Sequence, residues 1–306
     1  MKREDFRYQS ADGKNSIHAI RWLPDTAEIK GVIQFIHGMS GHAGRYEAFA
    51  ARFCEKGYAV TGHDQLGHGL SAKTSDDLGY FADEDGNKCL LSDIESLRKI
   101  TAELYPGKPY FLMGYSMGSF LARQYIVHSG DKLTGLILTG TGSYSPFSTR
   151  FGMSLCKTIA AFKGWRHRSK LLNNIVFAGH NRYFGARGGF DWFTRDTKAV
   201  LAFEKDPLCG FCFTLNGFYN LFLSINLLSN YDYIRSTPKE LPILILGGGE
   251  DPVGHFGKAP AAICERLRYI GMKDVTCKLY PDDRHDIFAE LDKDTVYDDV
   301  FCWIDK

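Results

Sequence analysis

Short apolar runs recur along this chain, four to six residues long and of the kind that forms strands buried on both faces of a sheet. They lie at Gly31–Ile36, Tyr58–Thr61, Pro109–Met113, Leu133–Leu138 and Leu241–Leu246, and Val275–Tyr280 is expected to be the last strand. Segments with helical spacing separate most of them, at Tyr46–Lys56, Cys89–Tyr105, Met117–His128, Ala259–Tyr269 and Thr295–Ile304. This alternation predicts an α/β fold with a mainly parallel central sheet and helices on both faces.

Two parts of the chain depart from this alternation. At the start, Phe6–Ser10 and Ser16–Trp22 flank a turn, which predicts an antiparallel hairpin. Between about residues 143 and 236, nearly a hundred residues separate two sheet strands, where a direct crossover needs about a dozen. We therefore expect a mostly helical inserted cap at 143–236, between core segments 1–142 and 237–306. Its candidate helices are Phe151–Phe162, Asp191–Phe203 and Phe218–Leu228.

Composition narrows the class of protein. With 306 residues, 44% hydrophobic and 24% charged, the chain has the composition of a folded protein with one large α/β domain and an insertion. The net charge of +1 gives no reason to expect a nucleic-acid partner. The first residues, Met1–Tyr8, carry charges where a signal peptide needs an apolar run, and no run of about 18 apolar residues follows, so a cytoplasmic location is expected.

The eight cysteines are scattered along the chain, which favours reduced, mostly buried thiols over a disulfide framework. Cys209 and Cys212 form the one closely spaced pair. A zinc or redox site would need a second ligand pair or a βαβ start beside it, and the sequence has neither there, so packing is the favoured role.

The segment Gly114–Gly118, Gly-Tyr-Ser-Met-Gly, lies between a predicted buried strand and a predicted helix. This is the context that the G-x-S-x-G nucleophile turn of an α/β-hydrolase requires. Gly114 and Gly118 remove side chains that would collide in the sharp turn, and the turn exposes the hydroxyl of Ser116. The start of the helix also directs free amides toward any oxyanion formed there. Ser116 is therefore the candidate nucleophile.

A serine hydroxyl needs a base, and in this fold the chain order is serine, acid, histidine. His285 follows the last predicted strand and is the candidate general base, whereas His255 lies too close to the preceding strand. Asp251, held in a turn by Pro252, is the candidate acid, and Glu250 is the alternative. Such an acid would fix the histidine tautomer and stabilise the imidazolium.

The loop after Gly31–Ile36 is a second part of the candidate site. A backbone amide of this loop completes the oxyanion hole in the fold, and we expect Met39 to supply it together with Met117. His37 and His42 lie in the same loop, but no carboxylate cluster accompanies them in the sequence, so structural roles are favoured over metal binding.

Several of these motifs together resemble one group of enzymes. They are His37–Tyr46, Gly62–Gly69 followed by Ser71, Gly114–Gly118, Glu250–Pro252 and Arg284–Asp286. This set is similar to the monoacylglycerol lipase and lysophospholipase group of α/β-hydrolases, of the serine aminopeptidase S33 type. The resemblance runs from about residue 30 to the end and is weakest through the inserted segment.

That resemblance implies a triad of Ser116, Asp251 and His285, an oxyanion hole formed by the amides of Met39 and Met117, and a reaction that uses neither cofactor nor metal. Members of the group often carry glutamate before the second histidine of the first loop. Here Gly41 takes that place, which bears on how glycerol would be recognised.

The inserted segment differs in charge from the rest of the chain. It holds 12 Lys and Arg against five Asp and Glu, whereas the remainder holds 25 against 31. The densest basic stretch comprises Lys163, Arg166, Arg168 and Lys170. Transient contact with an anionic membrane surface is one interpretation, and a solvated helix face is the other. The segment is also rich in Phe, Leu and Ile, part of which could line an acyl tunnel over Ser116.

The leading hypothesis is hydrolysis of an ester with a medium or long acyl chain, such as a monoacylglycerol or lysophospholipid, through an acyl-enzyme on Ser116. A serine aminopeptidase or amidase is the second hypothesis, although capture of a free amino terminus favours acidic residues, which are scarce in the inserted segment. A non-catalytic ligand receptor built on the same fold is the third.

Overall fold

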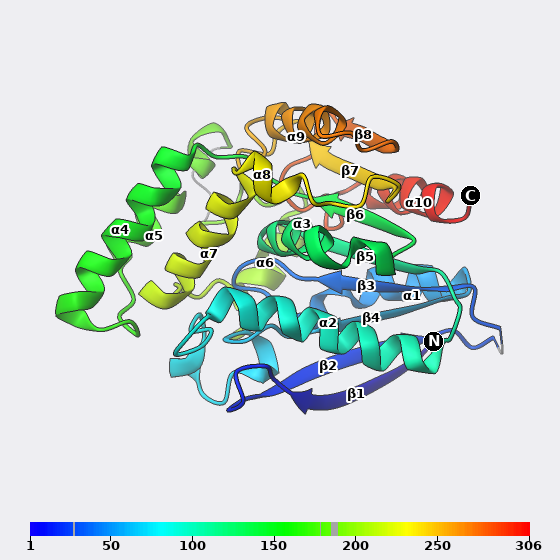
Figure 1. Ribbon diagram of the computed structural model, residues 1–306, viewed down its shortest axis with the longest axis horizontal. Helices are drawn as coiled ribbons and strands as arrows, with labels where there is room; N and C mark the ends of the chain where they lie inside the picture. The colour runs from blue at the N-terminus through cyan, green and yellow to red at the C-terminus, as the bar shows by residue number, and fades with distance from the viewer. Residues whose placement is uncertain (27, 178, 185–188) are drawn as a thin grey trace.

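The central feature of the computed structural model is an eight-stranded sheet with the strand order β1-β2-β4-β3-β5-β6-β7-β8 (Figure 1). The structure describes residues 1–26, 28–177, 179–184 and 189–306. The strands are β1 Lys2–Gln9, β2 Ser16–Leu23, β3 Gly31–Ile36, β4 Tyr58–His63, β5 Tyr110–Tyr115, β6 Gly135–Thr139, β7 Ile243–Gly248 and β8 Val275–Tyr280. β1 pairs with β2 and β2 with β4 in antiparallel fashion, and every later pairing is parallel. The predicted mainly parallel sheet and opening hairpin are confirmed.

The apolar runs form the centre of this sheet. All residues of β3, β4, β5, β6 and β7 are buried, because helices cover both faces. β1 alternates between exposed and half-buried positions, as expected of a strand at the edge. The strand starts at Lys2 and not at Phe6 as predicted, because its first residues are polar and do not form an apolar pattern.

Five helices of the core pack on the two faces of the sheet. α1 Glu47–Glu55 and α10 Lys293–Ile304 share one hydrophobic cluster, in which the ring of Phe49 lies 5.8 Å from that of Tyr297. α2 Gly86–Leu104, α3 Met117–Ser129 and α9 Lys258–Tyr269 contribute to the cluster on the other face. The sheet is thus covered on both sides, as predicted.

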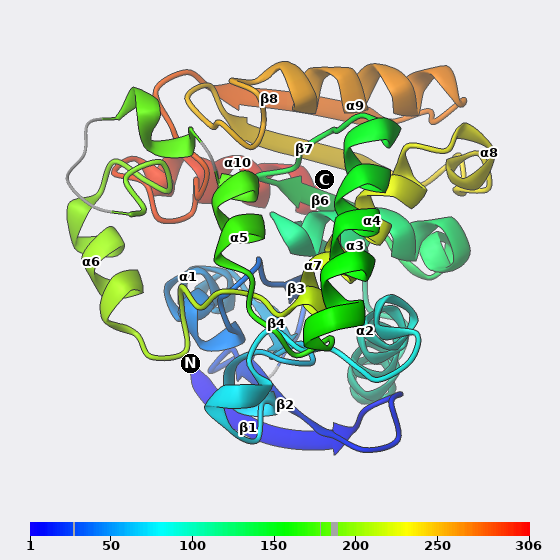
Figure 2. The same cartoon turned by 90° about the vertical axis from the view of Figure 1, so that its left-hand side faces the viewer.

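Residues 143–236, here called the inserted segment, lie between β6 and β7 and hold five α-helices in their described part. These are α4 Pro146–Lys163, α5 Lys170–Phe177, α6 Thr197–Lys205, α7 Leu215–Leu228 and α8 Tyr231–Ile234. Figures 1 and 2 show α4 and α5 side by side at one end of the molecule, with α7 between α4 and the core. Among the described helices of the chain, none is long and apolar enough to cross a membrane.

One helix prediction in the inserted segment is wrong. Residues 191–196 are not helical, and α6 starts only at Thr197, where the side chain of Asp196 caps it by accepting a hydrogen bond from the Lys198 amide at 2.9 Å. The reason is tertiary: the carbonyl oxygen of Phe193 accepts a hydrogen bond from the Asp286 amide at 2.7 Å, so this stretch is held against the loop after β8. The short helices α5 and α8 were not predicted from the sequence.

The sheet topology creates the position of the site. β4 and β5 lie on opposite sides of β3, so the chain turns in opposite directions after β3 and after β5. Loops that diverge in this way leave a crevice at the carboxyl ends of the strands. The loop after β3, residues 37–42, and the turn at Ser116 after β5 both lie at this point.

Asp64, directly after β4, ties three segments together below this crevice. One carboxylate oxygen accepts a hydrogen bond from the Ala43 amide at 2.7 Å, and the other accepts from the Leu70 amide at 2.8 Å and from His18 Nδ1 at 2.9 Å. A Cβ at Gly69, which has φ +48°, would lie 2.3 Å from this carboxyl group, so glycine is needed there. Although burial raises the pKa of Asp64, these hydrogen bonds hold it at about 2.

We expect Asp64→Asn to lower the free energy of unfolding by about 2–3 kcal/mol at neutral pH, because an amide nitrogen would face a backbone donor. The folded-state pKa lies below the value of 3.8 for an unperturbed Asp, so the carboxylate stabilises the fold above about pH 4 and loses this effect as the pH falls toward 2. Urea unfolding of both proteins should therefore show a difference that shrinks below pH 4. A difference that stays constant across this range would contradict the role assigned to Asp64.

Candidate active site

Ser116 lies at the sharp turn between β5 and α3. Its φ of +51° is rare for a residue with a side chain, and such strain persists only where the surroundings hold it. A Cβ at Gly118 would lie 2.1 Å from the carbonyl oxygen of Ile36, and one at Gly114 would lie 2.5 Å from that of Gly118. The two glycines therefore permit the close crossing of the chain that the sequence motif predicts.

The structure brings Ser116, His285 and Asp251 together in one hydrogen-bonded line. His285 Nε2 lies 2.8 Å from Ser116 Oγ, and His285 Nδ1 lies 3.0 Å from Asp251 Oδ1. The side chains of Asp251 and His285 are almost fully buried. When a carboxylate accepts from Nδ1, that nitrogen carries the proton and Nε2 is left to accept from the serine hydroxyl. This arrangement suits removal of a proton from Ser116.

The alternatives for the acid and the base lie elsewhere. Glu250 faces the Nε of Arg284 at 3.7 Å. The exposed His255 packs its ring 5.4 Å from that of Tyr144. Asp251, rather than Glu250, thus contacts the candidate base.

Backbone contacts fix the two later members of this line. Asp251 Oδ1 also accepts a hydrogen bond from the Val253 amide at 2.8 Å. A Cβ at Gly248, at the end of β7, would lie 2.2 Å from the carbonyl oxygen of Arg284. The loops after β7 and β8 are therefore packed closely against each other. The ring of Trp192, from the inserted segment, lies 5.0 Å from the ring of His285. The orientation of the imidazole is therefore set from both the sheet and the inserted segment.

The amides of Met39 and Met117, the predicted oxyanion donors, lie in the two segments that meet at Ser116. A Cβ at Gly38 would lie 2.9 Å from the ring of Tyr115 and 3.1 Å from the Cβ of Ser116, so the loop rests directly on the turn. Within the described ranges, neither amide is used in a turn or loop hydrogen bond. Both donors are thus available near the Ser116 hydroxyl.

His37, the first histidine of the loop, is buried and has a structural position. Its Nδ1 lies 2.8 Å from the carbonyl oxygen of Gly38, and its Nε2 accepts from the Gln65 amide at 3.0 Å. Burial lowers the pKa of His37 well below its usual value, with a further contribution from His68, so it stays neutral. Both ring nitrogens are occupied, which agrees with the structural role expected for it.

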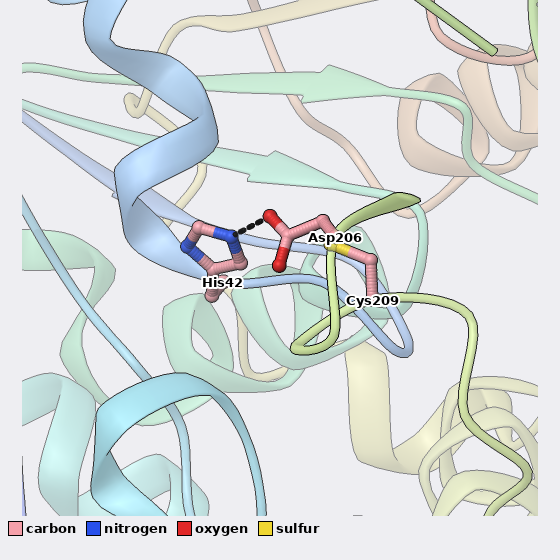
Figure 3. A group of neighbouring side chains, drawn as sticks. All are labelled: His42, Asp206 and Cys209. Atoms are coloured by element: carbon pink, nitrogen blue, oxygen red, sulfur yellow. Dashed lines mark hydrogen bonds and ion pairs between the residues drawn. The ribbon is translucent and has the colours of Figure 1, made fainter. Parts of the chain in front are cut away.

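Two groups of side chains in the described part of the chain have the composition of a metal site. The first comprises His42, Asp206 and Cys209 (Figure 3), where His42 Nε2 lies 2.8 Å from Asp206 Oδ2. Burial raises the pKa of the Cys209 thiol to about 12, and the carboxylate of Asp206 is already engaged by His42 and by the Leu208 amide.

The second group comprises Asp283, Glu290 and Asp292. Here the guanidinium of Arg195 already binds all three carboxylates, at 2.5–2.9 Å. Arg195, which belongs to the inserted segment, therefore supplies the positive charge that balances these carboxylates. The thiols of the chain are free in the structure, including Cys209 and Cys212.

A cavity of about 630 Å³ opens above Ser116, between the crevice and the inserted segment. Its volume falls within the range typical of sites for small molecules. Most of its wall is apolar, and α4, α5 and α7 contribute Phe151, Leu155, Ile175, Phe222 and Ile225 to it. Among its described lining residues there is no Asp or Glu.

Arg45 is the one Lys or Arg among the described lining residues of the cavity. Its guanidinium lies 5.1 Å and 4.8 Å from the ring centres of Phe193 and Phe203. Its Nη2 is 3.6 Å from a carboxylate oxygen of the buried Asp286. Burial raises the pKa of Asp286, while Arg45 opposes this shift. The wall of the cavity thus includes an apolar part at α4, α5 and α7 and a part beside Arg45, here called its two branches.

Sequence reasoning missed several residues of the site. Trp192 and Phe193 belong to the stretch wrongly expected to be helical, and Asp206 lies 164 positions from its partner His42. A local signal was present only at Asp206, where an aspartate before proline after a helical pattern indicates a turn. The spacing of hydrophobic and polar residues along a sequence does not reveal contacts between such distant segments.

Comparison with known proteins gives a consistent result. Residues 27–292 match the family described as serine aminopeptidase, S33. The chain is 25% identical to a monoacylglycerol lipase of Mycolicibacterium smegmatis, over 99% of this chain and 97% of that protein. It is 26% identical to the monoglyceride lipase of Homo sapiens, over 93% of this chain and 85% of that protein. A carboxyl esterase from Bacillus coagulans, solved in complex with glycerol, has 28% identity and a TM-score of 0.92, covering 100% of this chain and 98% of that one.

Proposed function

Since this chain belongs to the serine aminopeptidase S33 family of α/β-hydrolases, we propose that it cleaves esters of medium or long acyl chains through an acyl-enzyme on Ser116. The chain is a carboxylic ester hydrolase of the monoacylglycerol lipase-like group. The observation that carries the proposal is the line from Asp251 through His285 to Ser116, which ends at the floor of a mostly apolar cavity. Monoacylglycerols and lysophospholipids are the substrate class.

Acylation begins at the Ser116 hydroxyl. As Oγ attacks the ester carbonyl carbon, its proton passes to Nε2 of His285, and Asp251 stabilises the imidazolium through Nδ1. The carbonyl oxygen becomes an oxyanion, which accepts hydrogen bonds from the amides of Met39 and Met117. When this intermediate collapses, the ester C–O bond breaks and the leaving alcohol takes the proton from Nε2. The acyl group remains on Ser116.

Deacylation repeats these steps with water. His285 Nε2 takes a proton from the water molecule as its oxygen attacks the acyl carbon, and the same two amides hold the second oxyanion. The bond to Ser116 Oγ then breaks, Oγ recovers the proton from His285, and the fatty acid leaves. Every group in this cycle belongs to the chain or to the substrates.

The two branches of the cavity support this substrate class. The acyl chain lies in the branch between α4, α5 and α7, where apolar side chains replace its contact with water. The hydroxyl-bearing alcohol lies toward Arg45, whose guanidinium has only donors to offer. Residues 143–236 act in this proposal as a cap that closes both branches over Ser116.

An aminopeptidase reaction is less well supported. A protonated amino terminus needs a carboxylate beside the reacting carbonyl group, and the described lining residues include none. Arg45 would moreover repel such a substrate. Ester cleavage with a neutral or anionic alcohol group fits this electrostatic environment better.

Ser116→Ala should lower kcat on a dodecanoyl ester by about a thousandfold or more, because no other group here replaces the attacking oxygen. Mass spectrometry of the wild-type protein, quenched during turnover, should find the acyl group on the peptide that contains Ser116. Ser96→Ala, in α2, is the matched control and should keep the wild-type rate. Full activity of Ser116→Ala, or a faster reaction with an aminoacyl anilide than with the ester, would overturn the proposal.

The acyl branch gives a second expectation. Ile225 of α7 lines the cavity, and Ile225→Trp would fill part of the branch. We expect kcat/KM on the dodecanoyl ester to fall by about tenfold or more, because overpacking costs about 1–3 kcal/mol. The value of kcat/KM on the butanoyl ester should change by no more than about twofold. Ile225→Ala should keep long-chain activity. Equal losses on both esters would place the acyl chain elsewhere.

We also propose a transient contact of the inserted segment with a lipid surface. Phe162 at the end of α4 is 86% exposed and Leu171 at the start of α5 is 61% exposed, and Lys163 and Lys170 lie beside them. Arg166 and Arg168 do not contribute to this surface, because they bind Asp77 and the backbone around Ser75. Exposed aromatic and basic residues in this arrangement favour an anionic interface.

Phe162→Ser with Leu171→Ser should weaken sedimentation with phosphatidylglycerol vesicles by about tenfold, because both side chains lose their burial in lipid. Neither residue lines the cavity, so hydrolysis of a soluble ester should not change. Leu104→Ser, at a position of α2 that is 50% exposed, is the control. Binding of the double variant at the wild-type level would refute the membrane contact.

A further inference from the structure

The loop that carries the Met39 amide is held by the inserted segment as well as by the sheet. We call residues 38–42 the oxyanion loop and residues 206–211, between α6 and α7, the cap turn. Three hydrogen bonds join the two. Ser40 Oγ donates to the carbonyl oxygen of Phe211 at 2.7 Å, the Gly210 amide donates to the carbonyl oxygen of Ser40 at 3.0 Å, and His42 Nε2 lies 2.8 Å from Asp206 Oδ2.

Ser40 needs this support because of its backbone conformation. Its φ is +51°, in the left-handed region that costs a residue with a side chain of order 1 kcal/mol or more. Ser40 makes both of its hydrogen bonds to the cap turn in this conformation, and the residue is buried. Because Ser40 directly follows Met39, a change in its backbone moves the Met39 amide relative to Ser116.

His42 and Asp206 form the charged part of the same connection (Figure 3). Asp206 Oδ2 accepts from His42 Nε2, while Oδ1 accepts from the Leu208 amide at 2.9 Å, so one carboxylate joins the oxyanion loop to the cap turn. Burial raises the pKa of Asp206, but the hydrogen bond from His42 and the Leu208 amide lower it overall, so the carboxylate stays ionised. Its side chain is 28% exposed, and that of His42 is 16% exposed.

The other side of the oxyanion loop leaves little freedom. The Ala43 amide is bound by Asp64, and Gly38 rests on Tyr115 and Ser116 with no room for a Cβ. The loop is therefore fixed at its two ends by the sheet and at Ser40 and His42 by the cap turn. Movement of the cap turn would act on the middle of the loop, where the Met39 amide lies.

We propose that His42 and Asp206 are positioning residues, which make the oxyanion hole depend on the inserted segment being in place. With the cap turn seated, the Met39 amide points toward the oxyanion, and with it displaced, Ser40 relaxes and this donor is lost. Neither residue touches the reacting atoms. The inference rests on the proposed ester hydrolysis and adds to it the residues that couple closure over the substrate to stabilisation of the transition state.

The test compares the loss of this pair with the loss of an ion pair elsewhere between the inserted segment and the core. Asp206→Ala and His42→Ala should each lower kcat on a soluble ester by about tenfold, a fraction of the effect of removing an oxyanion donor, with KM within about twofold. The double variant should be no slower than either single variant, because both remove one connection. Arg166→Met breaks the 3.0 Å pair with Asp77, which includes no residue of the oxyanion loop or the cap turn, and should leave kcat unchanged.

Two further measurements separate positioning from a loss of folding. Asp206→Asn keeps an acceptor for His42 and should recover at least about half of the lost rate. An alkyl boronate, whose bound oxygen mimics the oxyanion, should bind Asp206→Ala about tenfold more weakly, whereas an uncleavable ether analogue of the substrate should bind as before.

The outcomes distinguish the two proposals. A wild-type protein without esterase activity would refute the proposed function. An active wild type with an unchanged kcat in Asp206→Ala and His42→Ala, or an equal loss in Arg166→Met, would refute only the positioning role. Equal weakening of the boronate and the ether would also refute it, because the pair would then act on substrate binding alone.

Discussion

The close crossing of two chain segments at the carboxyl ends of β3 and β5 is the constraint on which the site depends. The carbonyl oxygen of Ile36 approaches Gly118 so closely that no side chain fits between them, and a Cβ at Gly38 would lie 3.1 Å from the Cβ of Ser116. Ser116 has a strained backbone at this crossing, and the loop that carries the Met39 amide packs against it. The candidate nucleophile and the proposed oxyanion donors are thus brought together by sheet topology, which places β3 and β5 next to each other.

The inserted segment completes this arrangement from above and binds both halves of the candidate site. Residues 191–195 lie against the loop of His285, where Arg195 joins the buried Asp283 and Glu290. The cap turn holds the oxyanion loop through Ser40 and His42. A segment that only covered the substrate would not need such contacts. In our proposal it helps to position the base and one oxyanion donor, and its closure is part of assembling the catalytic geometry.

The sequence allowed much of the fold to be predicted, for reasons that lie in single segments. A strand such as β3 is buried on both faces and therefore shows an unbroken apolar run, and the glycines around Ser116 follow from the sharp turn. His285 and Asp251 could be selected by chain order, and the structure places both in contact with the expected neighbours. The start of β1 and the irregular stretch at Trp192 could not be predicted, because an edge position and a tertiary hydrogen bond decide them. The pair of His42 and Asp206 is of the same kind, since only the folded chain brings its members together.

The central claim is that Ser116 takes the acyl group while the Met39 and Met117 amides hold the oxyanion, below a branch that receives the chain. A crystal structure of the protein treated with a long-chain alkyl phosphonate tests this most directly. We expect phosphorus bonded to Ser116 Oγ, one phosphonyl oxygen within hydrogen-bond distance of both amides, and the alkyl chain between α4 and α7. Phosphorus on another side chain, or a phosphonyl oxygen turned away from the two amides, would contradict the account.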